Sequence, residues 1–164
     1  AAREVEMNEA VYRCASANSS NIGGLVTQGV YYVYRYSALL AHGEISEGEQ
    51  INVVVLTVNF GNILAASYAK EMGIPIAKLI CASNENKVLF DFFTTGCYDR
   101  NRDFILTSSP SMDILISSNL ERLIYQTAGR DAEKNREFMK ELNTDGIYTI
   151  IEDMTAQKKA FYGT

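Results

Sequence analysis

The residues with the clearest chemical potential form a short turn, Asn59-Phe60-Gly61-Asn62, between an apolar segment and a helical pattern. At the start of a helix several backbone N–H groups lack intrahelical partners, and the positive end of the helix dipole lies there. Such a turn can hold an anion the size of a phosphate. A turn with one glycine is also found at ordinary helix starts, so the surrounding residues must decide between the two interpretations.

The segments around this turn predict a strand, a helix and a second strand. The apolar run 51–57 is typical of a buried strand, and residues 62–72 predict a helix that ends at Gly73. A second strand is expected over 77–82, after Pro75. Strands joined by one helix and short turns favour a parallel crossover, so the pattern predicts an α/β fold.

Further elements are predicted before and after this unit. Asn21 is a plausible N-cap for a long, mostly buried helix that ends near His42-Gly43, and internal glycines predict an irregular first turn. The other expected elements are helices at 88–95, 115–127 and 131–143 and a strand at 147–151. Residues 1–164 are therefore expected to form a single α/β domain, a three-layer αβα sandwich with a mainly parallel sheet.

Composition narrows the classes of function. The net charge is −5 and no basic run occurs, which disfavours an extended nucleic-acid surface. No stretch of 18 or more apolar residues is present, so no membrane span is expected. The three cysteines have no spacing typical of metal ligands, so no metal site is predicted and a reduced, cytoplasmic setting fits best.

Four short motifs follow one another along the chain. They are Asn18-Ser19-Ser20-Asn21-Ile22, residues 59–65, Ser83-Asn84-Glu85-Asn86 and Ser109-Pro110-Ser111-Met112-Asp113. With residues 31–34 and 118–122, the chain resembles the central part of a threonine synthase over roughly residues 15–151. The resemblance implies a pyridoxal-phosphate-dependent fold of the tryptophan synthase β-subunit type. It also implies an enzyme that converts O-phospho-L-homoserine and water to L-threonine and phosphate.

The resemblance assigns roles to two of these motifs. It places the loop for the cofactor phosphate on the turn and the residue before it: Val58, Asn59, Phe60, Gly61 and Asn62. It places the substrate phosphate at Asn18, Ser19 and Asn21, whose amide and hydroxyl groups can donate hydrogen bonds. The segments 83–86 and 109–113 are expected beyond strand ends, facing the cleft, without individual roles.

Four departures from the family pattern argue against activity of this chain alone. The Schiff-base lysine of the family lies upstream of Asn18, where residues 1–17 hold no lysine, so no catalytic residue is assigned. Val58 replaces a usual glycine, and a positive φ there would be strained. Gly24 replaces a usual arginine, so a bidentate contact to the substrate phosphate would be lost. The family's C-terminal part, which contacts the pyridine ring, has no counterpart here.

Three hypotheses follow from these observations. The first is an incomplete segment of a threonine synthase, inactive alone and completed by another part of the enzyme. The second is a phosphate-binding module without catalysis, and in both cases the expected partner is a small molecule that carries a phosphate. The third is a structural or assembly fragment whose sheet edge is covered by another copy, as in a homo-oligomer.

Overall fold

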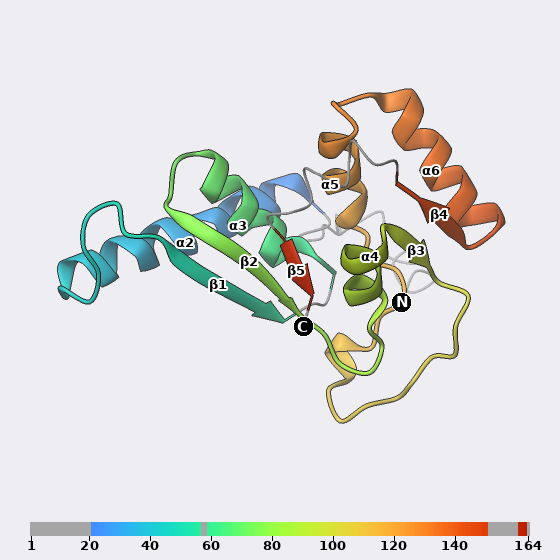
Figure 1. The fold of residues 1–164 in the computed structure, drawn as a ribbon, viewed down its shortest axis with the longest axis horizontal. Coiled ribbons are helices and arrows are strands. Elements are labelled where there is room, and N and C mark those ends of the chain that lie inside the picture. Colours follow the sequence, from blue (N-terminus) through green and yellow to red (C-terminus); the bar gives the residue numbers. More distant parts are fainter. Residues whose placement is uncertain (1–20, 57–58, 151–160, 164) are drawn as a thin grey trace, which may run out of the picture.

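The fold alternates helices with short strands. A computed structural model of the chain describes residues 21–56, 59–150 and 161–163 (Figure 1). In chain order these residues form α2 (Ile22–Ala41), β1 (Ile51–Leu56), α3 (Gly61–Glu71), β2 (Ile76–Ala82), α4 (Val88–Thr95), β3 (Cys97–Asp99), a short 3₁₀ helix (Pro110–Met112), α5 (Leu120–Thr127), α6 (Ala132–Thr144), β4 (Ile147–Thr149) and β5 (Phe161–Gly163).

The main sheet has three parallel strands in the order β1-β2-β5. Val53 of β1 is paired with Leu79 of β2, and Leu79 is in turn paired with Phe161 of β5. Helix α3 connects β1 to β2, so the predicted strand, helix and parallel strand are confirmed, as is the α/β class. Strand β5 was not predicted, because three residues are too short to show a hydrophobic period.

Helices α2 and α3 lie side by side against one face of this sheet (Figure 1). Alternate residues of β1 point to opposite faces. Val53 and Val55 pack against the core, whereas Val54 and Leu56 are 63% and 65% exposed. The prediction that this apolar run is a buried strand was therefore wrong, since β1 is an edge strand with one open face in the described part of the chain.

Helix α2 begins and ends as its sequence predicted. The side-chain oxygen of Asn21 accepts a hydrogen bond from the N–H of Gly23 at 2.9 Å, and Gly43 follows the helix with φ +69°. The first turn is nevertheless helical from Ile22 onward, so the predicted irregularity was wrong. None of the described helices is long and apolar enough to cross a membrane.

The prediction that α2 is mostly buried was also wrong. Only Leu25, Gly29 and Tyr36 are buried, because α3 covers one side of the helix. Gly29 faces this neighbour: a Cβ atom added to it would lie 3.9 Å from the backbone oxygen of Ala65. Tyr32 is partly buried against the core, whereas six other large apolar residues of α2 are exposed: Ile22, Val26, Val30, Tyr31, Val33 and Tyr34.

Helices α4 and α6 match their predicted ranges, and Asp131 caps α6 by accepting hydrogen bonds from two backbone amides. Helix α5 begins at Leu120 rather than at residue 115, because Ser117, Ser118 and Asn119 are held in a turn by contacts to other segments. The predicted strand after α6 is β4, which pairs with the unpredicted β3 in a small antiparallel sheet.

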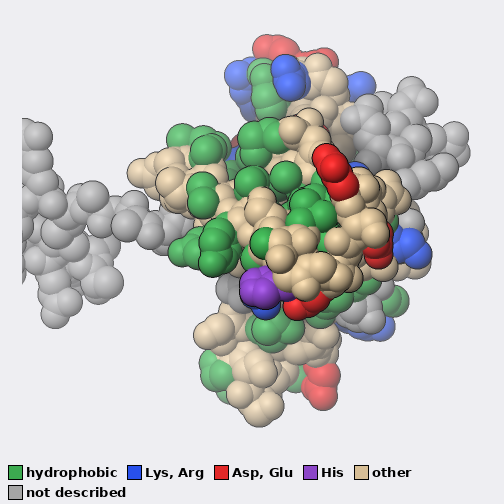
Figure 2. Space-filling model, turned by 90° about the vertical axis from the view of Figure 1, so that its left-hand side faces the viewer, with side chains coloured by type: hydrophobic (Ala, Val, Ile, Leu, Met, Phe, Trp, Pro, Cys, Tyr) green, Lys and Arg blue, Asp and Glu red, His purple; other side chains and the backbone are tan. Residues whose placement is uncertain are grey.

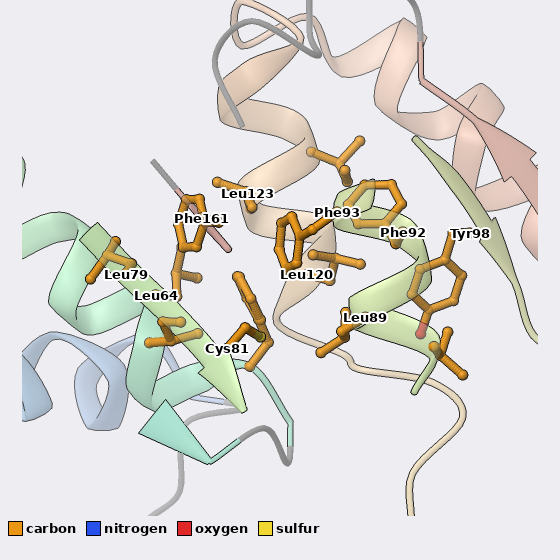
Figure 3. Packing of buried hydrophobic residues seen from close by; sticks show 14 of the residues in the cluster. Leu64, Leu79, Cys81, Leu89, Phe92, Phe93, Tyr98, Leu120, Leu123 and Phe161 are labelled. Atoms are coloured by element: carbon orange, nitrogen blue, oxygen red, sulfur yellow. The ribbon is translucent and has the colours of Figure 1, made fainter. Parts of the chain in front are cut away.

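An aromatic cluster joins the parallel sheet to α4 (Figure 3). The rings of Phe93 and Phe161 are stacked with centroids 5.4 Å apart. Phe60, from the candidate turn, lies 5.8 and 5.6 Å from these two rings and is 2% exposed. Cys81 of β2 is completely buried beside β5. The turn is therefore attached directly to the core.

Candidate functional site

The turn between β1 and α3 has the geometry of an anion site. Phe60, the N-cap of α3, has a left-handed backbone with φ 60° and ψ 0° and makes no side-chain cap. The first three amides of α3, those of Gly61, Asn62 and Ile63, have no acceptor among the described residues. These N–H groups lie at the positive end of the helix dipole, where a phosphate is favoured.

The amides border an open pocket of about 560 Å³. Its lining comes from β1, the turn and one face of α2: Gln28, Tyr32, residues 53–56 and residues 59–63. The side-chain oxygen of Gln28 is buried and has no hydrogen-bond partner in the described part of the chain. The pocket therefore combines backbone donors with an unpaired side-chain oxygen.

Tyr32 connects α2 to the turn. Its hydroxyl donates to the side-chain oxygen of Asn62 and, at 3.2 Å, to the backbone oxygen of the same residue. Burial raises the pKa of Tyr32 to about 12, so the hydroxyl stays protonated near neutral pH. Tyr32 thus acts as a donor that orients Asn62 at the edge of the pocket.

The segment before α5 anchors Asn59. The backbone N–H and the hydroxyl of Ser118 donate to the side-chain oxygen of Asn59 at 2.7 and 2.9 Å. The side-chain and backbone N–H groups of Asn119 donate to the backbone oxygen of Asn59 at 2.9 and 3.3 Å. Residues 118–122 had no predicted role, because no local pattern indicates a contact across this distance in the chain.

The two polar segments without assigned roles meet each other. Asn84 and Asn86 donate from their side-chain amides to Oδ1 of Asp113 at 2.7 and 3.1 Å. The backbone N–H of Thr107 donates to Oδ2 of Asp113 at 2.9 Å, and its hydroxyl donates to Oδ1 at 2.8 Å. These hydrogen bonds stabilise the ionised carboxylate and hold the pKa of Asp113 below its usual range. The bond from the Thr107 backbone makes the largest contribution.

The position of these segments differs in part from the prediction. Asn84 follows the end of β2, as expected for a residue beyond a strand end. None of the side chains in this network lines the pocket at the turn. Asp113 ties the loop after β2 to the loop before α5 through these hydrogen bonds.

The structure brings together four of the five predicted cofactor residues: Asn59, Phe60, Gly61 and Asn62. Val58, Asn18 and Ser19 lie outside the described residues. Asn21 is described, but its side-chain oxygen caps α2 and the residue does not line the pocket. The left-handed residue of the turn is Phe60, whose buried ring holds it in place.

The site lies in a parallel α/β arrangement, at a helix start that follows the edge strand of the sheet and whose first amides have no acceptor among the described residues. A helix start of this kind can hold an anion. No family model matches the chain. It is 50% identical over 137 residues to "Threonine synthase-like 1" of Macaca fascicularis, and the aligned residues make up 83% of this chain and 18% of that protein. It is 39% identical over 153 residues to threonine synthase of Methylobacillus glycogenes, and the aligned residues make up 92% of this chain and 31% of that protein.

A solved structure gives the same result. The PLP-bound threonine synthase from Brucella melitensis matches with a TM-score of 0.83 and 36% identity, over 99% of this chain and 34% of that one. The chain is therefore homologous to a segment of the threonine synthases and threonine synthase-like proteins, which confirms the resemblance seen in the motifs. It spans between 18% and 34% of the length of these three proteins.

Proposed function

We propose that this chain is the phosphate-holding segment of a threonine synthase and that residues 58–62 bind the phosphate of pyridoxal phosphate. The observation that carries the proposal is the set of unpaired amides of Gly61, Asn62 and Ile63 at an open pocket. The likeness to a PLP-bound threonine synthase supports the choice of cofactor.

The residues of this chain bind and orient rather than react. Bound pyridoxal phosphate would supply the electron sink for the chemistry. The N–H groups at the start of α3 would donate hydrogen bonds to its phosphate oxygens, and the low polarity of the surrounding strand would strengthen these charge-assisted bonds. We assign the phosphate of O-phospho-L-homoserine to Asn18, Ser19 and Asn21, where Asn21 can donate from its NH₂ group while its oxygen caps α2.

The second part of the proposal is that another part of the enzyme completes the site. Helix α2 exposes an apolar stripe of Ile22, Val26, Val30 and Tyr34, each between 54% and 70% exposed. Figure 2 shows apolar side chains gathered on the side of the molecule where this helix ends. Contiguous apolar surface of this kind marks an interaction site. We propose that the enzyme part outside the aligned span covers this stripe, in a cytoplasmic setting, and that the chain alone is inactive.

Ligand titration of the chain tests the cofactor site. Pyridoxal phosphate and inorganic phosphate are added separately, and the amide signals of Gly61, Asn62 and Ile63 are followed by NMR. We expect these three signals to shift with both ligands, and not with pyridoxal, which lacks the phosphate. Asn62→Asp should weaken binding by roughly tenfold, because a carboxylate beside the site repels the anion. Silence of these amides in the folded protein would contradict the proposal.

A phosphate-binding module without catalysis is the second candidate. Gly24 in place of an arginine and Val58 in place of a glycine favour it, since both changes remove features of the family's phosphate sites. The two candidates differ when the missing part of a threonine synthase is supplied as a separate polypeptide. Release of phosphate from O-phospho-L-homoserine by the mixture supports the enzyme segment, and binding without release supports the module.

A further inference from the structure

We propose that Ser118 and Asn119 are positioning residues of the phosphate turn: by holding Asn59 they set the direction of the Gly61–Ile63 amides and thereby the affinity for phosphate. This inference rests on the proposed phosphate site. It assigns a role to a segment that does not line the pocket at the turn and that no local sequence pattern connects to the turn, since the Ser118–Asn59 contact joins residues 59 positions apart.

The first step is that both acceptors of Asn59 are bound by one short segment. Ser118 binds its side-chain oxygen through two donors, and Asn119 binds its backbone oxygen through two more. The backbone oxygen of Asn59 belongs to the same planar peptide unit as the N–H of Phe60. Holding that oxygen therefore fixes the orientation of this peptide plane. Phe60 and the amides of Gly61–Ile63 follow directly after it, so their directions depend on it.

The second step is that the anchor itself is rigid. Asn119 is completely buried, and its side-chain oxygen accepts a hydrogen bond from Arg122 in the first turns of α5. Both ends of its amide group are therefore engaged, which fixes the orientation of the NH₂ group toward Asn59. The turn is attached to α5 through Asn119 and to the core through the ring of Phe60.

The third step concerns energy. A left-handed backbone at a residue other than glycine costs roughly 1–2 kcal/mol, so contacts elsewhere must hold Phe60 in this state. A turn already held in its binding conformation loses little entropy when a ligand arrives, which favours affinity. Removing the anchor should therefore weaken phosphate binding even where the fold survives.

The side chain of Ser118 offers a clean test because the residue is exposed and its hydroxyl makes a single described contact, to Asn59. Ser118→Ala removes that hydroxyl and leaves the core intact. Ser118→Thr keeps a hydroxyl and is the conservative rescue. Ser46→Ala, at an exposed serine in the loop between α2 and β1, is the matched control. Asn119→Ala removes the buried anchor and is expected to have the larger effect.

The experiment measures the affinity for inorganic phosphate and for pyridoxal phosphate from the amide shifts of Gly61–Ile63, together with urea unfolding. We expect Ser118→Ala to weaken both ligands about fivefold and Asn119→Ala at least about tenfold. Ser118→Thr and Ser46→Ala should remain within about twofold of the original chain. The ligand-free Gly61 amide should also shift in Ser118→Ala and exchange faster with solvent.

These measurements distinguish failure of the positioning role from failure of the phosphate site. Affinity and ligand-free Gly61 signals that are unchanged in Ser118→Ala would overturn the positioning role. If the original chain itself ignores phosphate, the proposed function fails and with it the effect of Ser118 on affinity. The ligand-free Gly61 amide then decides only whether Ser118 holds the turn: a shift sustains this and no shift overturns it. Because Ser118 is exposed, this reading holds even if Asn119→Ala does not fold.

Discussion

Phe60 combines a left-handed backbone with a ring that is 2% exposed, so strain and burial oppose each other in one residue. Phe60→Ala should lower the free energy of unfolding by about 3–5 kcal/mol, because the ring leaves a cavity beside Phe93 and Phe161. Phe60→Gly should be no less stable than Phe60→Ala, since glycine adopts this backbone without strain. Urea unfolding of both variants measures the difference, and a glycine variant clearly less stable than the alanine variant would contradict a strained turn.

The buried phenol of Tyr32 makes the stability of the fold depend on alkaline pH. Burial raises its pKa to about 12, above the value near 10 of an unfolded chain, and burial also raises the pKa of Tyr98 and Tyr148. The stabilisation from such a phenol is fully present below pH 10 and is lost as the pH rises toward 12. The free energy of unfolding should therefore fall above pH 10.

Tyr32→Phe isolates the contribution of one phenol to this loss. The variant has no phenolic proton to release at this position. Its unfolding free energy should therefore fall less steeply with pH, by up to about 1.4 kcal/mol per pH unit, which is the slope that one proton contributes. Urea unfolding at several pH values between about 9 and 11.5 measures the slope. Tyr31→Phe, at an exposed position of the same helix, is the matched control. An equal slope in Tyr32→Phe and the original chain would show that Tyr32 does not carry the effect.

Helix α2 begins at a residue with two possible roles. The oxygen of Asn21 caps the helix, and the resemblance also assigns Asn21 to the substrate phosphate. Asn21→Ala should lower the free energy of unfolding by about 1 kcal/mol, because the cap is lost. Asn21→Asp keeps an acceptor at the positive end of the helix dipole, so stability should be retained.

Binding separates the two roles of Asn21. A carboxylate cannot donate to a phosphate and repels it, so Asn21→Asp should weaken binding of O-phospho-L-homoserine by roughly tenfold if the residue contacts that ligand. Binding is measured in the mixture with the missing enzyme part, next to urea unfolding of the chain. Full stability with unchanged binding would leave Asn21 with the capping role alone.

The ends of α2 could be predicted from the sequence, because caps and positive-φ glycines act within a few residues. Its burial could not. Val26 and Val30 are apolar, and an apolar residue predicts a covered surface without saying what covers it. The same reason explains β1, where Val54 looks like a core residue in the sequence and is exposed in the described part of the chain.

Contacts between residues far apart in the chain could not be predicted from the sequence either. Strand β5 has three residues and acquires its role only by pairing with β2. The position of the turn between β1 and α3 was predictable because a strand, a turn with Gly61 and a helix start are neighbours in the chain. Its attachment through Ser118 and Asn119 was not, because that contact depends on where α5 lies in the folded molecule.

At the scale of the whole molecule, the described residues include two open apolar surfaces that lie on different elements next to the candidate site. One is the stripe on α2, and the other is the face of β1 that carries Val54 and Leu56. Helix α2 has a single charged residue, Arg35, so little in its sequence opposes coverage by another apolar surface. Since the chain spans 34% of the Brucella melitensis threonine synthase, coverage by the remaining enzyme is the arrangement that we expect for α2.

Charging one surface at a time tests this arrangement. Val30→Lys places a charge on the α2 stripe, and Val54→Lys places one on the open face of β1; the two residues are 64% and 63% exposed. Both variants should keep the free energy of unfolding within about 0.5 kcal/mol, because neither side chain is in the core. Val30→Lys should weaken association with the missing enzyme part at least about tenfold, since a lysine ammonium would be buried in the contact.

Sedimentation velocity of each variant, alone and mixed with the missing enzyme part, measures this association. Val54→Lys serves as the matched control, because it adds the same charge to the other surface. If Val54→Lys rather than Val30→Lys abolishes the complex, the sheet face is the docking surface. If the original chain forms a homo-oligomer that Val30→Lys dissolves into monomers while the mixture shows no complex, a second copy covers α2, and the assembly hypothesis replaces complementation by the rest of the enzyme.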